Sequence, residues 1–250
     1  MSFTIEQLID DRNRALHDEV AAQVRIELRE EPEPEEGWGS QYRAKESCGI
    51  IFHAPTPYPQ ACFAHELLHI KYEANGYRRP MHAVSAPVGS MSQDDLNGYR
   101  DWVGDFFVFV YNQLMHHKMY PDFIALGYPP NEFFRDEPGR LDRLAARLAD
   151  LKEEQRRSPN DLNAEYFAKL FFALKNPHED NARIQGMLAE LRSISVGLYN
   201  TLESYLSQWK SDSKPDVSRY LAVFFAVLQQ PNVGFGHDGA ITIWARDLMK

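Results

Sequence analysis

The sequence contains few of the features that would place it outside the cell or in a membrane. It has only two cysteines in 250 residues, Cys48 and Cys62, so the fold does not depend on a disulfide framework. No apolar run approaches the roughly 18 residues of a membrane span, and the first residues have no apolar segment typical of a secretory signal. We therefore expect a soluble cytoplasmic protein without a membrane partner, long enough to bury a substantial core.

Positive charge is also scarce. Lys and Arg number 27 against 36 Asp and Glu, which gives a formal net charge of −9. A general nucleic-acid binder would normally present a basic stripe, so we expect no nucleic-acid partner. The acidic segment EEPEPEE at 30–36 is predicted to be a solvated spacer that follows the first helix.

Hydrophobic periodicity predicts an α+β fold that is mostly helical. The half before residue 130 holds the short β structure, and helical patterns dominate from Pro138 onward, with the glycine-rich segment NVGFGHDG predicted as a loop. We expect a domain at 1–130 and a helical region at 131–250, which either forms its own bundle or packs with the first. The predicted elements of the first half are a helix at 4–29, a strand at 47–54, a helix at 60–74 that stops at Asn75–Gly76, a loop at 77–93, and a helix from 94 or 95 to about 120 that breaks or bends at Pro121.

The segment CFAHELLHIKYE, 62–73, carries the pattern H-E-x-x-H. Residues four apart lie on one face of a helix, so His65 and His69 can direct their imidazoles at one ion, with Glu66 beside it. Two such nitrogens and a third protein ligand hold Zn²⁺ with a position open for water, and an adjacent carboxylate can accept the proton of that water. The apolar residues around the triplet indicate a buried or cleft-lining position.

The segment PQACFAHELLHI, preceded by SCGIIFHA, resembles the strand-to-helix core of the zincin metallopeptidase superfamily, especially its small cytoplasmic members. The resemblance covers about 30 residues. It implies a small zincin-like core, zinc on His65 and His69, Glu66 as general base, and hydrolysis of a peptide or protein substrate. The longer metzincin pattern is absent after His69.

The third ligand is not contained in this motif. In gluzincin-type sites it comes from a following helix, and zinc accepts His as well as Glu, so we prefer His116. His82 is the alternative, because its separation from His69 resembles that in SprT-like proteases, although AVSAPVGSM lacks the glycine and aromatic that follow there. The other candidates considered are Glu73, Asp101, Asp105 and His117.

Several further residues have side chains that could bind a metal or take part in catalysis, but we interpret them as structural: Cys62, His53, Tyr120 and His237. The predicted function is a zinc-dependent hydrolase in which Glu66 activates water and the strand at 48–53 pairs with an extended substrate. Two alternatives remain open: a non-catalytic regulator that keeps a zincin core as scaffold, with the helical half as its interaction surface, and a helical interaction protein without metal. The oligomeric state is not predicted.

Overall fold

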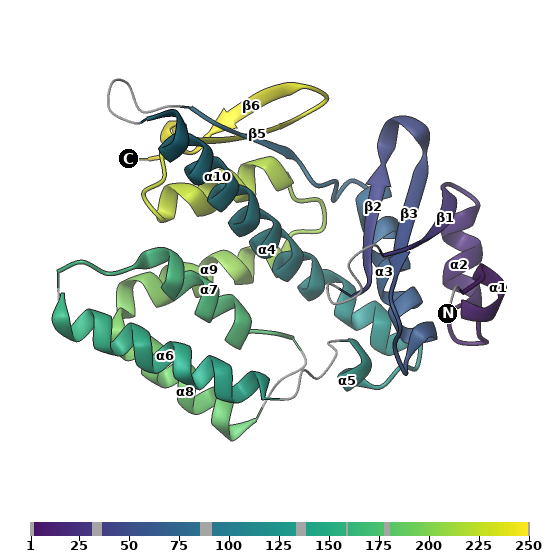
Figure 1. Ribbon diagram of the computed structural model, residues 1–250, viewed down its shortest axis with the longest axis horizontal. Coiled ribbons are helices and arrows are strands. Elements are labelled where there is room, and N and C mark those ends of the chain that lie inside the picture. Colours follow the sequence, from purple (N-terminus) through teal and green to yellow (C-terminus); the bar gives the residue numbers. More distant parts are fainter. Residues whose placement is uncertain are drawn as a thin grey trace. The chain divides into compact units, whose positions relative to one another are not determined.

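The computed structural model describes residues 3–31, 37–85, 92–133, 139–158, 160–177 and 181–249. Within them helices predominate and strands form two small sheets, which confirms the α+β, mostly helical fold (Figure 1). The acidic segment predicted as a spacer lies largely outside the described residues, since only its first two residues are described.

The chain forms two compact units, and the division passes through the middle of one helix. The first unit comprises Met1–Arg78 and His117–Glu137, and the second comprises Arg79–His116 and Pro138–Lys250. This differs from the predicted boundary at residue 130, because residues 79–116 group with the C-terminal half. The reason is tertiary pairing: a strand at 81–84 and the first part of the following helix both pack on C-terminal elements.

The first unit is built on a three-stranded sheet with the order β1-β3-β2. The central strand β3 pairs parallel to β1 and antiparallel to β2. Figure 1 shows α3 lying along this sheet, and α3 contacts both β2 and β3. The elements of this unit are α1 (Ile5–Leu8), α2 (Arg14–Ala21), β1 (Arg25–Glu30), β2 (Gly39–Arg43), η2 (Ala44–Glu46), β3 (Cys48–His53), α3 (Pro59–Ala74), the end of α4 (Gln93–Ala125) and α5 (Pro130–Phe133).

The prediction of one helix over 4–29 is wrong. Two short helices and a strand occupy this range, because local side-chain hydrogen bonds and a period-two pattern interrupt it. The Asp10 carboxylate accepts hydrogen bonds from the backbone N–H groups of Arg12 and Asn13, which turns the chain between α1 and α2. The segment RIELRE at 25–30 alternates charged and apolar residues, and it forms β1 instead of continuing the helix.

The strand β3 and the helix α3 confirm the predicted strand at 47–54 and helix at 60–74. They pack closely because β3 contains a glycine at the contact: a Cβ atom added to Gly49 would lie 2.6 Å from the Ile70 side chain. Ile70 directly follows His69, so this approach fixes the depth at which the histidine-bearing part of α3 sits on the sheet. The helix stops after Ala74, at the predicted Asn75–Gly76 signal.

The second unit combines helices with a second three-stranded sheet of order β4-β5-β6, antiparallel throughout. Its aromatic core includes Phe106 of α4, which contacts Phe224 and Phe225, and the Trp209 indole donates a 2.7 Å hydrogen bond to the Leu114 carbonyl. The elements are β4 (Met81–Val84), α4 up to His116, α6 (Arg140–Arg157), α7 (Ala164–Leu174), α8 (Ala182–Ile194), α9 (Val196–Ser211), α10 (Val217–Val227), β5 (Val233–His237), β6 (Ala240–Trp244) and η3 (Ala245–Leu248).

Three further predictions are corrected. The loop at 77–93 contains strand β4, and its residues 86–91 lie outside the described residues. The segment NVGFGHDG supplies strand β5 instead of a loop, because its glycines are needed for close strand packing. The helix α4 continues through Pro121 to Ala125, so of the two predicted alternatives, a break or a bend at Pro121, the break is wrong.

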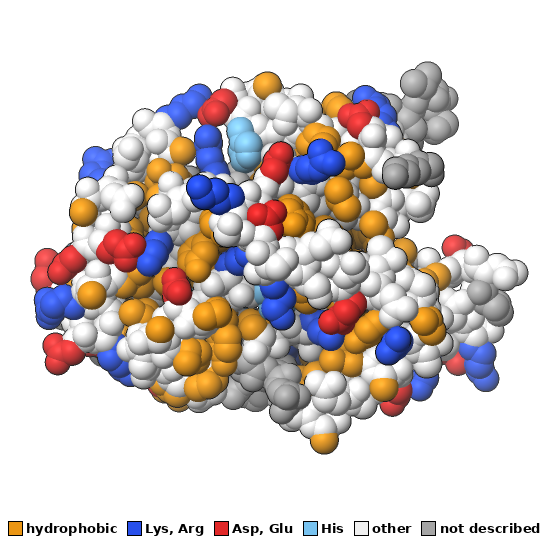
Figure 2. Space-filling model, turned by 180° about the vertical axis from the view of Figure 1, so that it is seen from behind, with side chains coloured by type: hydrophobic (Ala, Val, Ile, Leu, Met, Phe, Trp, Pro, Cys, Tyr) orange, Lys and Arg blue, Asp and Glu red, His pale blue; other side chains and the backbone are white. Residues whose placement is uncertain are grey.

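No helix among the described residues is long and apolar enough to cross a membrane. On the face drawn in Figure 2, Lys and Arg side chains are interspersed with Asp and Glu side chains.

Candidate metal centre

The helix α3 presents the polar triplet of the H-E-x-x-H motif from an otherwise apolar surround. Its apolar residues around the triplet are fully buried, or nearly so in the case of Leu68: Phe63, Ala64, Leu67, Leu68 and Ile70. His65 and His69 lie one turn apart on the same face, with ring centroids 5.0 Å apart. His69 is buried, and His65 is partly exposed. The motif is therefore a helix that carries both imidazoles on one side, as the spacing predicted.

The second helix α4 supplies a third imidazole. The side chains of His65, His69 and His116 each offer a ligand atom, and these atoms all lie within 4.8 Å of one another. His116 is 6% exposed, so it is buried like His69. It stands directly before His117 in the continuous helix α4, and the division between the two units falls between these two residues. The three histidines lie close enough together to bind one metal ion.

The Glu66 carboxylate lies next to His65 in the sequence and is 6% exposed. Burial of a carboxylate is costly unless hydrogen bonds or a nearby positive charge offset it. Its Oε2 atom accepts a 2.8 Å hydrogen bond from the Ser40 hydroxyl of β2. The carboxylate is thus held by the sheet on one side while its own helix carries the two histidines.

Aromatic rings line the His65 side of the cluster. The Phe133 ring of α5 lies 4.5 Å from the His65 imidazole, centroid to centroid, and Phe123 of α4 lies 6.5 Å from it. Tyr120 packs its ring edge against Phe133 at 5.3 Å, and burial raises the pKa of its hydroxyl, so it stays protonated at neutral pH. These rings restrict the orientation of His65 and lower the local polarity around it.

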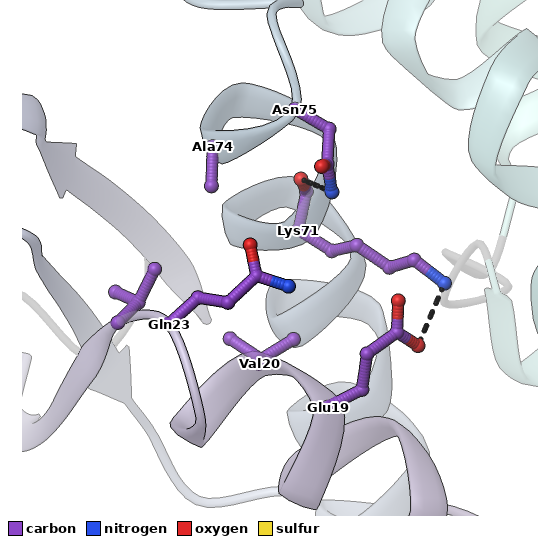
Figure 3. Close-up of a pocket in the computed structure, with 7 residues that line it drawn as sticks. Glu19, Val20, Gln23, Lys71, Ala74 and Asn75 are labelled. Carbon is purple, nitrogen blue, oxygen red and sulfur yellow. Dashed lines mark hydrogen bonds and ion pairs between the residues drawn. The ribbon is translucent and has the colours of Figure 1, made fainter.

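Polar contacts at the C-terminal end of α3 fix this helix against its neighbours within the first unit. Lys71 forms a 3.0 Å ion pair with Glu19 of α2, drawn in Figure 3, and the Tyr72 hydroxyl donates a 2.9 Å hydrogen bond to the Lys118 carbonyl of α4. Burial raises the pKa of Tyr72 well above its usual value, which keeps this donor protonated.

The recess drawn in Figure 3 encloses only about 10 Å³, which is about the space of one water molecule. It is therefore too small for a ligand pocket, and its Lys71–Glu19 ion pair joins α3 to α2.

The remaining candidates for the third ligand lie outside the three-histidine cluster. His82 is on β4, where its ring packs at 5.1 Å from Phe107 and burial lowers its pKa. Asp101 and Asp105 are exposed on α4. The cluster contains neither Glu73, which is partly exposed two turns beyond Glu66 on α3, nor His117, which is buried on α4.

The residues read as structural have structural surroundings. His53 is buried between the rings of Phe3 and Trp38, and burial lowers its pKa. Cys62 is buried near the Thr56 hydroxyl, and His237 contacts the Ser218 hydroxyl at 3.2 Å in the second unit.

Sequence reasoning missed Ser40. It stands in the segment GWGS, for which no strand is predicted, and a lone serine carries no motif. Only the pairing of β2 beside β3 brings its hydroxyl to Glu66.

The chain matches no protein-family model, and neither curated proteins nor solved structures give a significant match.

Proposed function

We propose that this protein is a zinc-dependent hydrolase, a peptidase of the cytoplasm that resembles the zincins in its H-E-x-x-H helix. The observation that carries the proposal is the convergence of three imidazoles, His65, His69 and His116, together with the buried carboxylate of Glu66, which directly follows His65 on the same helix. Neutral imidazoles suit Zn²⁺, and a set of three protein ligands is typical of catalytic zinc sites, whereas structural sites are closed by four.

The chemistry divides between the ion and the chain. When bound, Zn²⁺ would polarise a carbonyl and lower the pKa of a water molecule, as in other catalytic zinc sites. Glu66 would accept the proton of the attacking water and then deliver it to the leaving amine. His65, His69 and His116 would hold the ion, and the aromatic rings of Phe133 and Phe123 would limit the access of bulk water on the His65 side.

The substrate in this proposal is a peptide in extended conformation. The strand at 48–53 cannot accept it as predicted, because β3 is central and pairs with β1 on one side and β2 on the other. The edge strand β2 is the better candidate, since an extended peptide can add to a sheet edge through main-chain hydrogen bonds. The contact of Ser40 with Glu66 supports this choice, because it joins β2 to the proposed general base.

The experiment is to compare the zinc content and the rate of peptide hydrolysis of the wild type and Glu66→Gln. We expect one zinc per chain in both, and a fall in kcat of at least about 100-fold in the variant, since general acid–base catalysis contributes at least that much. A pooled library of quenched fluorescent peptides supplies substrates of many different sequences in one assay.

Glu73→Gln is the matched control, because it makes the same chemical change two turns further along α3 and outside the cluster. It should hold zinc and hydrolyse peptides as the wild type does. A wild type that takes up no zinc when zinc is supplied, or a Glu66→Gln variant with an unchanged rate, would contradict the proposal.

A further inference from the structure

We infer that Ser40 is a positioning residue that orients the Glu66 carboxylate for proton transfer. The inference rests on the proposed hydrolase function and adds to it a residue outside the H-E-x-x-H motif. It starts from one contact: the Ser40 hydroxyl, on the edge strand β2, donates a 2.8 Å hydrogen bond to Oε2 of Glu66 on α3.

The register of the sheet directs Ser40 toward α3. Ser40 pairs with Ile51 of β3, and two residues further along Tyr42 pairs with Gly49. Gly49 faces α3, because a Cβ atom at that position would meet the Ile70 side chain. Paired residues lie on the same face of a sheet and alternate residues share a face, so Ser40 also faces α3.

The same alternation directs the neighbouring side chains of β2 away from the helix. Gln41 follows Ser40 and therefore points to the opposite face of the sheet. A hydroxyl at position 40, and not at 41, is what the geometry requires in order to reach Glu66.

The hydrogen bond removes a specific freedom of the carboxylate. The terminal torsion of a glutamate is broad, so an unrestrained carboxylate rotates about its last bond. With Oε2 held by Ser40, the second oxygen Oε1 has a fixed direction, and it is this oxygen that we assign to the proton of the attacking water. Proton transfer requires a heavy-atom separation of hydrogen-bond length, so a carboxylate that rotates loses rate even when its substrate binds normally.

The test compares Ser40→Ala, Ser40→Thr and a control, Ser193→Ala, in the zinc-loaded full chain. The control also removes a serine hydroxyl, but from the exposed surface of α8 in the second unit. We expect Ser40→Ala to lower kcat by about 10- to 100-fold, the range found when outer partners of a catalytic metal site are removed. The zinc content should stay at the wild-type value and KM should change less than twofold, because Ser40 is not one of the three clustered histidines. Ser40→Thr keeps the hydroxyl and should recover most of the rate, and Ser193→Ala should keep the wild-type rate.

A second measurement does not depend on activity. Urea unfolding of wild type, Ser40→Ala, Glu66→Gln and the double variant forms a double-mutant cycle, and residues in contact give a non-additive result. Additive effects would mean that the contact is absent in solution, and the inference would fall. It would also fall if Ser40→Ala kept the wild-type kcat, or if Ser40→Thr were no better than Ser40→Ala. A wild type that binds zinc but hydrolyses no peptide would overturn the proposed function, and this inference with it, whereas a hydrolytic wild type with an active Ser40→Ala variant would overturn the inference alone.

Discussion

Replacement of His116 by alanine should abolish most of the stabilisation that zinc gives to the folded protein. The three clustered imidazoles exist as a set only in the native fold, because two come from α3 and the third from α4. A ligand that binds the native state and not the unfolded chain stabilises the native state by RT ln(1 + [L]/Kd). Without His116 only the two histidines of α3 remain, and they form a much weaker zinc site. The increase in the free energy of unfolding that zinc produces should therefore largely disappear.

The magnitude follows from the size of the chain. Free zinc at about 1,000 times its dissociation constant adds about 4 kcal/mol to the free energy of unfolding. For chains of 150–250 residues each kcal/mol raises Tm by about 2–4 °C, so the wild type should gain about 8–16 °C between chelator and zinc. His116→Ala should gain no more than a few degrees.

The assay is thermal unfolding followed by circular dichroism, in chelator and in buffered zinc. His117→Ala is the matched control, because it removes a neighbouring imidazole of the same helix that is also buried and lies outside the cluster. Both variants lose packing, and that loss cancels in the difference between the two conditions. His82→Ala should keep the full gain as well. A full zinc-dependent gain in His116→Ala, or its loss in His117→Ala, would refute the assignment of His116.

Two further predictions concern the second unit. Gly234→Ala should lower the free energy of unfolding, measured by urea titration, by about 1–3 kcal/mol, because the added Cβ would lie 2.7 Å from the Ile241 and Trp244 side chains. The control is Gly186→Ala on α8, where the added Cβ would meet open space. It should leave the free energy of unfolding unchanged or raise it by up to about 1 kcal/mol. Burial lowers the pKa of His82 below 6.5, so the unfolded chain binds the proton more readily and stability falls as the pH drops below about 6.5 toward the folded value. Urea midpoints of His82→Gln should fall less steeply over that pH range than those of the wild type, and equal slopes would contradict this account.

The parts of the fold that could be predicted are those that local patterns determine. The helix α3 has a run of apolar residues around its polar triplet and a stop signal at Asn75–Gly76, and both act within a few residues. The strand β1 was missed because Leu28 also fits a helical spacing when it is joined to Val20 and Val24 before it. The segment adopts the two-residue period of a strand and not the 3.6-residue period of a helix because it pairs in parallel with β3. Information on that pairing is not contained in the local sequence.

The strand β5 was missed for a related reason. Glycine is usually unfavourable in a strand, so VGFGH reads as a loop. In the fold Gly234 is required because the side chains of Ile241 and Trp244 from β6 occupy the space of its Cβ atom. A penalty in local propensity was therefore outweighed by close packing with a strand that follows in the chain.

Some residues of the candidate site could be predicted from their spacing in the sequence, whereas others depend on tertiary contacts. His65, Glu66 and His69 were predicted from spacing alone, because an α-helix converts that spacing into a common face. His116 was preferred from the expectation of a ligand on a following helix, and the cluster of the three histidines agrees with it. Ser40 could not be found in this way, because its role depends on which strand lies beside β3 and in which register.

The position of Glu66 bears on whether the centre is catalytic or only structural. A metal ion that only stabilised the fold would require its ligands and nothing more. A buried carboxylate that does not coordinate the ion would then lower the stability of the fold through its desolvation. The group of clustered side chains that can hold a metal among the described residues contains three histidines and not Glu66, which directly follows the clustered His65 in the sequence. The carboxylate is nonetheless almost fully buried and held by Ser40. Features that cost stability concentrate where function requires them, and a buried, oriented carboxylate beside a three-imidazole set is what activation of water demands. This arrangement favours the hydrolase over the non-catalytic scaffold, which would be equally well served by a glutamine at position 66.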